Sequence, residues 1–69
     1  MNIQSLLNRA QKKLISSSIV SAKLDSEILL SKVLKKNRKY LILNSKEELK
    51  KKNIQSFEFL LERRKTLIN

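Results

Sequence analysis

The apolar positions of this chain recur at helical spacing, and the first segment that shows the pattern runs from Ile3 to Ile15. Its apolar side chains fall on one stripe about 100° wide, which predicts an amphipathic helix. The stripe consists of Ile3, Leu6, Leu7, Ala10 and Leu14. Asn2 is the expected N-cap, because its side chain can accept a hydrogen bond from a free amide of the first turn. After a run of serines, Ile19 and Val20 are expected to tuck under a short loop.

The second segment, from Ala22 to Leu34, is apolar on nearly every side. At about 100° per residue four side chains cover one broad face, while Leu24 and Ile28 point elsewhere. The four are Leu29, Leu30, Val33 and Leu34. Ser21 is the expected N-cap, and Ser26 places a small side chain in the broad face, where another helix can come close. Because a helix that is apolar nearly all round lies at the centre of a bundle, this one is expected to be the central element.

The rest of the chain predicts shorter elements and one long final helix. A polar connector, Lys35–Lys39, is followed by Tyr40–Leu43, which is long enough for one or two buried turns. Ser45–Glu48 matches a capping box and predicts a short helix after it. The last helix is expected from Lys51 to Leu67. Together these elements predict an all-α fold, a single domain over residues 1–69 built as a small bundle of about five helices around the second.

The last helix carries a charge on its apolar side. That side is formed by Ile54, Phe57, Leu60, Leu61, Leu67 and Ile68. Arg64 falls in the middle of it, and an unpaired charge buried there would be very costly. The second helix begins with two carboxylates, Asp25 and Glu27, in the most apolar part of the chain. We therefore predict a structural ion pair in which Arg64, helped by Arg63, bonds to Asp25 or Glu27, since the planar fork of arginine suits a carboxylate.

Phe59 lies on the opposite side of the last helix, away from the stripe that contains Phe57 and Leu61. Either the short helices wrap round and cover it, or it stands on the surface. A lone exposed aromatic needs no function, yet a phenylalanine left in water is a large apolar area for so short a chain. We expect Phe59 to be at least partly exposed, and we treat it as a candidate partner contact.

The composition argues against most catalytic and cofactor sites. The 69 residues include no Cys, His, Gly or Pro, so a disulfide, a zinc cluster and a glycine-rich nucleotide loop lack the residues that build them. Without His or Cys no nucleophile has a neighbouring base, and Asp25 with Glu27 lacks the other groups that acid–base catalysis needs. The expectation is therefore no catalytic, no cofactor-binding and no metal-binding residues. The absence of glycine also counts against hairpins and supports the all-α fold.

The net charge of +10, from 16 basic and 6 acidic side chains, is the strongest compositional signal. Such a charge attracts polyanions or an acidic partner, although an A/T-biased coding sequence would produce the same abundance of lysine with no functional meaning. No apolar run approaches the roughly 20 residues that span a membrane, and the N-terminus lacks the pattern of a secretory signal. We expect a cytoplasmic monomer that does not bind membranes.

Three stretches of the chain, taken in order, resemble a known family. They are SLLNRAQKKL, SAKLDSEILLSKVLKKNRKYLIL and SFEFLLERRK. Their succession is similar to the N-terminal helical domain of the release factor glutamine methyltransferases, the HemK/PrmC family, and the likeness covers nearly the whole chain. The matching features are the Asp-Ser-Glu start of the second helix with Leu29-Leu30 after it, the Tyr40-Leu41 turn, and the final Leu-Leu-Glu-Arg-Arg. The sequence departs from the family at Phe59, where a polar residue is usual.

In that family a five-helix N-terminal domain precedes a Rossmann-like catalytic domain. The resemblance implies a parent enzyme that moves a methyl group from S-adenosylmethionine to the Gly-Gly-Gln glutamine of class I peptide-chain release factors. The family's cofactor loop and its Asn-Pro-Pro-Tyr motif belong to the catalytic domain and do not occur in this sequence. The resemblance therefore implies a release-factor-recognition domain that is not catalytic by itself, with the release factor and the catalytic domain as its partners.

Two other functions are compatible with the sequence. One is a small basic helical nucleic-acid-binding protein, whose affinity would fall steeply with salt. Its lysines are scattered, however, and its aromatics are only one Tyr and two Phe, which counts against a specific nucleic-acid reader. The other is a helical bundle with no partner of its own. Binding of a release factor, compared with binding of an unrelated RNA, would separate these interpretations.

Overall fold

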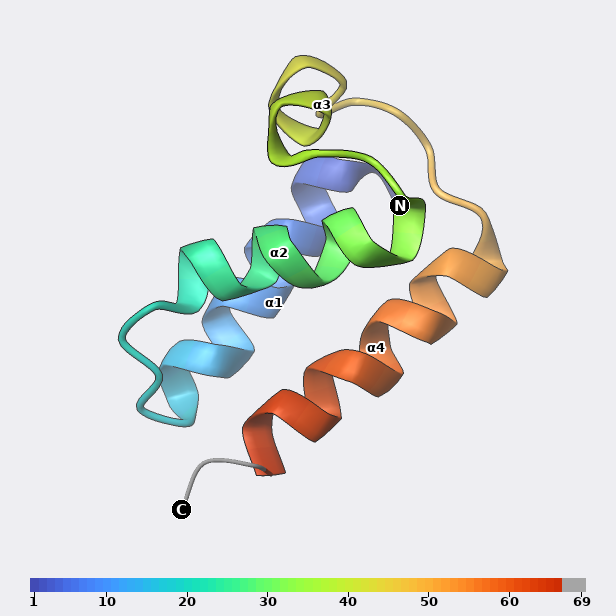
Figure 1. Ribbon diagram of the computed structural model, residues 1–69. Helices are drawn as coiled ribbons and strands as arrows, with labels where there is room; N and C mark the ends of the chain where they lie inside the picture. The colour runs from blue at the N-terminus through green and yellow to red at the C-terminus, as the bar shows by residue number, and fades with distance from the viewer. Residues whose placement is uncertain (67–69) are drawn as a thin grey trace.

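The computed structural model describes residues 1–66, and within that range the protein is all-α. Its helices are α1 (Ile3–Ser16), α2 (Ala22–Leu34), α3 (Arg38–Leu43) and α4 (Lys51–Thr66). The chain reverses direction between α1 and α2, and α4 crosses back along α2 in the opposite sense (Figure 1). Helix α2 contacts each of the other three. The predicted all-α bundle around a central second helix is confirmed.

Helix α1 forms where the apolar stripe predicted it, and it ends at Ser16. The Asn2 side chain caps it by accepting a hydrogen bond from the Ser5 amide at 2.8 Å. Ile3, Leu6, Ala10 and Leu14 are buried, whereas Leu7 is half-buried at the edge of the stripe. In the loop that follows, Ile19 is buried but Val20 is fully exposed, so the prediction that both tuck inward is wrong for Val20. Ser18 adopts a left-handed conformation there (φ 62°). The tight turn directs the Ile19 side chain toward the core and leaves the Val20 side chain in solvent.

Helix α2 has the predicted bounds, but its surroundings differ from the prediction on one side. Ser26 is completely buried, and its hydroxyl donates to the Ala22 carbonyl at 2.7 Å. Its polar atom is thus satisfied within its own helix while its small size admits a neighbour. Leu24 and Ile28 remain exposed, so α2 is enclosed on most of its circumference and open on one side. Ser21 is the N-cap residue, as predicted, but its hydroxyl donates to the Asp25 carboxylate instead of accepting from a backbone amide.

Residues 45–50 form no helix, so the predicted short fourth helix is wrong and the described residues contain four helices instead of about five. After a turn at residues 44–46, the segment passes the start of α1, where Glu48 forms an antiparallel bridge with Asn2. The amides of Ile3 and Gln4 donate to the carbonyls of Glu47 and Ser45 at 3.0 and 2.9 Å, and the Leu49 amide donates to the Met1 carbonyl. The first-turn amides of a helix have no partner within the helix. Here the Ile3 and Gln4 amides bond to the Glu47 and Ser45 carbonyls, which a helix in this segment would need for its own hydrogen bonds. The predicted capping box does not form.

The hydrophobic core is built from all four helices and the loop after α1. It consists of Ile3, Leu6, Ala10, Leu14, Ile19, Ala22, Leu30, Leu41, Phe57 and Leu61. Phe57 is the largest of its fully buried side chains. Ile54 and Leu60 of the predicted α4 stripe are only half-buried. Leu67 and Ile68, the other predicted members, lie outside the described residues.

Tyr40 links α3 to the segment that follows it. Its hydroxyl donates a hydrogen bond to the Glu47 carboxylate, and the Asn37 side chain caps α3 by accepting from the Tyr40 amide at 2.8 Å. The hydrogen bond to Glu47 raises the pKa of Tyr40 above its ordinary value of 10.0, with smaller contributions from desolvation and from the negative charge of Glu47. Ionisation would break the bond and place two negative charges side by side.

We therefore expect Tyr40, the only tyrosine, to ionise above pH 10.0 in the folded protein. A phenol whose folded pKa is raised stabilises the fold below its unfolded pKa, and this contribution is lost as pH rises through the folded pKa. Ultraviolet absorbance of the phenolate measures the midpoint directly. Glu47→Gln should bring the midpoint down toward that of a free tyrosine, and an unchanged midpoint in that variant would contradict the assignment.

Candidate functional site

Asp25 and Arg64 join the first turn of α2 to the last turns of α4. The Arg64 Nε and Nη2 atoms donate to Asp25 Oδ2 at 3.1 and 2.8 Å. The same oxygen accepts the Ser21 hydroxyl at 2.9 Å. The structure thus brings together two of the three residues expected in the ion pair. Arg63 does not take part in this contact; its guanidinium lies over the Phe59 ring, 5.9 Å from the centroid.

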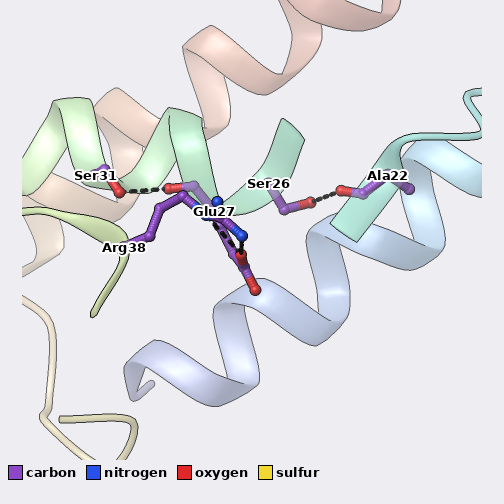
Figure 2. Close-up of polar contacts among 5 residues, drawn as sticks. All are labelled: Ala22, Ser26, Glu27, Ser31 and Arg38. Atoms are coloured by element: carbon purple, nitrogen blue, oxygen red, sulfur yellow. Dashed lines mark hydrogen bonds and ion pairs between the residues drawn. The ribbon is translucent and has the colours of Figure 1, made fainter. Parts of the chain in front are cut away.

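Glu27, the third predicted residue, bonds to a different arginine. It is a buried carboxylate, and its Oε1 accepts from Nε and Nη2 of Arg38 at 3.0 and 2.8 Å (Figure 2). Arg38 is the first residue of α3, so this pair fixes α3 against α2. The prediction had placed Arg38 in a solvated connector. The residue type could have identified Arg38 as the partner of Glu27. It is the one arginine in a lysine-rich stretch, and only arginine presents a planar fork to a carboxylate.

A third ion pair was not predicted from the sequence. Glu58 of α4 lies 3.2 Å from the Lys13 amine and 3.7 Å from Arg9 Nε, both on α1. Asp25, Glu27 and Glu58 therefore link α2 to α4, α2 to α3 and α1 to α4. The carboxylates of the apolar second helix act as polar anchors for its neighbours.

Removing Arg64 should destabilise the protein moderately. Arg64→Ala is expected to cost about 1–2 kcal/mol, because the pair is largely buried but Asp25 keeps the Ser21 hydroxyl and the positive end of α2 as partners. Lys65→Ala is the matched control, since Lys65 lies next to Arg64 and, within residues 1–66, pairs with Glu62 alone, at 3.6 Å in the same helix. Urea unfolding of both variants measures the difference. Equal costs would show that the Asp25–Arg64 contact does not anchor α4.

The candidate functional site is an open hollow between α2 and α4, here termed the α2–α4 surface. Two adjoining depressions that share Lys32 make it up. Its apolar part consists of Ile28, Leu29, Val33, Phe59 and Leu60. Asn53, Gln55 and Ser56 line one end, and the Asp25–Arg64 pair lines the other. Helices α2 and α4 run antiparallel (Figure 1), and side chains from both helices line the two depressions.

Phe59 is the most prominent apolar group of this surface. It is 63% exposed and is accompanied by Ile28, which is also exposed, whereas Leu29, Val33 and Leu60 are half-buried. A phenylalanine that projects from the side of α4 opposite Phe57 contributes nothing to the core. Whether it contacts a partner stays a prediction that binding experiments must test.

Unpaired positive charge gathers at one end of the α2–α4 surface. All six Asp and Glu side chains have partners within residues 1–66. Within residues 1–66, six exposed lysines at or directly beside the end of α2 and the start of α4 have no carboxylate at ion-pair distance. They are Lys32, Lys35, Lys36, Lys50, Lys51 and Lys52. The antiparallel packing of α2 and α4 brings the two groups together, since Lys32 and Asn53 line the same hollow.

The part of the chain that the structure describes contains neither a metal-ion cluster nor a membrane-spanning helix. No cluster of three or more Asp, Glu, His and Cys side chains suitable for a metal ion occurs among residues 1–66. In the same range, none of the helices combines the length and apolar character needed to cross a bilayer.

Comparison with known proteins identifies the family. A family model described as the PrmC N-terminal domain matches residues 5–67. The chain belongs to this family. The resemblance noted in the sequence is thereby confirmed, and the chain is a helical domain of a kind associated with methyltransferases.

Two curated relatives extend this result. The protein named "Bifunctional methyltransferase" from Rickettsia felis is 41% identical over 63 residues, which cover 91% of this chain and 12% of that protein. Its namesake from Rickettsia conorii is 40% identical over the same length, with the same coverage. The chain thus spans only about an eighth of the length of these relatives. No solved structure matches it.

Proposed function

We propose that this chain recognises the protein substrate of a methyltransferase, and that the substrate is a class I peptide-chain release factor. The observation that carries the proposal is the match of the PrmC N-terminal domain to nearly the whole chain, together with relatives named methyltransferases. In the proposed parent enzyme a separate catalytic domain binds S-adenosylmethionine and methylates the Gly-Gly-Gln glutamine in the cytoplasm.

The geometry supports a recognition role. Three ion pairs tie the helices to one another, and the α2–α4 surface includes the exposed apolar side chains of Ile28 and Phe59. A framework held in this way can present a contact surface without reorganising on binding, and preorganisation lowers the entropic cost of association. The unpaired lysines favour a partner with negative charge.

Calorimetric titration of this chain with a purified class I release factor tests the proposal. A saturable heat with one-to-one stoichiometry is expected, and an unrelated acidic protein of similar size should give none. If the release factor and the unrelated protein bind equally weakly, the proposed recognition role is wrong.

By itself the chain should not transfer a methyl group. With labelled S-adenosylmethionine, a release factor and this chain alone, we expect no label in the release factor, because the sequence contains no glycine-rich cofactor loop and no motif to hold a glutamine amide. Scintillation counting of the isolated release factor is the measurement, with a complete methyltransferase as positive control. Labelling by the chain alone would contradict this assignment of roles.

Nucleic-acid binding is the second candidate, and the net charge of +10 is the observation that favours it. A protein that neutralises several phosphates loses affinity linearly with the logarithm of salt concentration. Fluorescence anisotropy with a labelled RNA across a salt series measures that slope. Binding that survives physiological salt and exceeds the affinity for the release factor would favour this function over the first.

A further inference from the structure

We infer that the α2–α4 surface binds an acidic amphipathic helix of the partner protein. Apolar side chains of that helix would cover Phe59 and Ile28, and its carboxylates would meet the lysines around Lys32. The inference deepens the proposed function and rests on it in taking the partner to be a protein.

The shape of the surface favours a helix. Helices α2 and α4 lie antiparallel with a shallow hollow between them, and the half-buried side chains of Leu29, Val33 and Leu60 form its floor. A third helix laid along such a hollow packs its apolar side chains between the two, which is a common mode of peptide recognition. Phe59 stands at the edge, where a buried aromatic typically supplies a large share of binding energy.

The charges around the α2–α4 surface favour an acidic helix as the partner. Every carboxylate near the hollow is engaged within the chain, as Asp25 is by Arg64. Lys32 lies at the junction of the two depressions and has no carboxylate at ion-pair distance within residues 1–66. Lys35, Lys36, Lys51 and Lys52 extend the positive charge beyond it. A partner with carboxylates on the flanks of its apolar stripe would complement this rim, whereas a basic one would be repelled.

The same surface is poorly suited to nucleic acid. Proteins that bind single strands stack successive bases on several exposed aromatics. Among the described residues only Phe59 is an exposed aromatic, because Phe57 is buried and Tyr40 is half-buried with its hydroxyl bonded to Glu47. The apolar floor would meet no complementary group on a phosphate backbone.

Binding of a synthetic peptide to the surface tests the inference without requiring the natural partner. The probe is a fluorescent helical peptide of about 15 residues with leucines on one stripe and glutamates on its flanks. A scrambled peptide of the same composition and a version with lysine in place of glutamate are the controls. Anisotropy should rise only with the first peptide, and equal binding of the scrambled peptide would overturn the inference.

Variants of the protein locate the site. Phe59→Ser and Lys32→Glu should each weaken peptide binding by about tenfold or more, the range of an interface anchor and of a reversed charge. Ile42→Ser on α3 and Lys12→Glu on α1 are matched controls that remove an exposed apolar group and reverse an exposed lysine elsewhere. They should change the affinity less than about twofold. If Ile42→Ser weakens binding as much as Phe59→Ser, and Lys12→Glu as much as Lys32→Glu, the α2–α4 surface is not the binding site.

The same four variants, titrated with the class I release factor, separate this inference from the proposed function. If wild type binds the release factor and Phe59→Ser binds it equally well, the surface is wrong and the function stands. If the peptide binds at the surface but no release factor binds wild type, the surface stands and the proposed partner is wrong. Displacement of the peptide by a short RNA at physiological salt, with loss of RNA binding in Phe59→Ser, would assign the surface to nucleic acid and overturn the inference.

Discussion

Replacing Phe57 with alanine is expected to unfold most of the protein at room temperature. Phe57 is the largest completely buried side chain and packs with Leu61 of α4 against the core. Removal of a buried phenylalanine ring costs about 3–5 kcal/mol. A single hydrophobic core in a chain of this size supplies only about 3–5 kcal/mol in total, so the variant should have little or no stability left.

Circular dichroism of Phe57→Ala and Phe59→Ala makes the comparison. Both substitutions remove the same ring from the same helix, but Phe59 is 63% exposed. Phe59→Ala should retain the helical spectrum and change the free energy of unfolding by less than about 1 kcal/mol. If the two variants unfold alike, Phe59 is part of the core and the α2–α4 surface does not exist as described.

Replacing Arg38 with methionine is expected to have the second-largest effect, about 2–3 kcal/mol, although half of the arginine side chain is exposed. The cost arises at its partner. The Glu27 side chain is only 8% exposed, and both of its hydrogen bonds from Arg38 would be lost, which leaves a buried charge without a partner. Methionine resembles the aliphatic part of the arginine side chain and has a similar helix propensity, so that the lost hydrogen bonds dominate the change.

Arg9→Met isolates the effect of the buried carboxylate. Arg9 is as exposed as Arg38, at 51% against 50%, but its partner Glu58 is 25% exposed and retains Lys13. We expect Arg9→Met to cost less than about 1 kcal/mol. Glu27→Gln, which keeps an acceptor for Arg38, should cost about 1 kcal/mol. Urea unfolding that gives equal losses for Arg38→Met and Arg9→Met would show that Glu27 does not need its partner.

The long helices could be predicted from the sequence because local spacing determines them. The stripe from Ile3 to Leu14 and the cap at Asn2 act within a few residues of one another. Residues 45–50 could not be predicted in this way. Their capping-box pattern favours a helix locally, but they donate to and accept from the backbone around Met1 and Ile3, more than forty residues earlier in the chain. A competing tertiary contact of this kind leaves no periodic signal in the sequence.

The ion pairs also differ in how far the sequence could predict them. Arg64 could be identified as an inward charge because it interrupts an apolar stripe, and Asp25 was a nearby carboxylate on the central helix. The partner of Glu27 depended on where the chain turns after Lys35, which takes a left-handed conformation at the end of α2. That turn sets the position of Arg38, and only the folded chain reveals it. The exposure of Phe59 followed from its helical position, whereas the hollow beside it required the antiparallel packing of α2 and α4.

The most direct test of the account is chemical-shift mapping of the backbone amides by NMR while a purified class I release factor is added. We expect the amides whose signals shift or broaden to lie on α2 and α4 around Ile28, Lys32 and Phe59, and we expect those of α3 to change little. The absence of any change at excess release factor would contradict the proposed recognition function. Changes confined to α3 and residues 45–50 would contradict the α2–α4 surface as the place where recognition occurs.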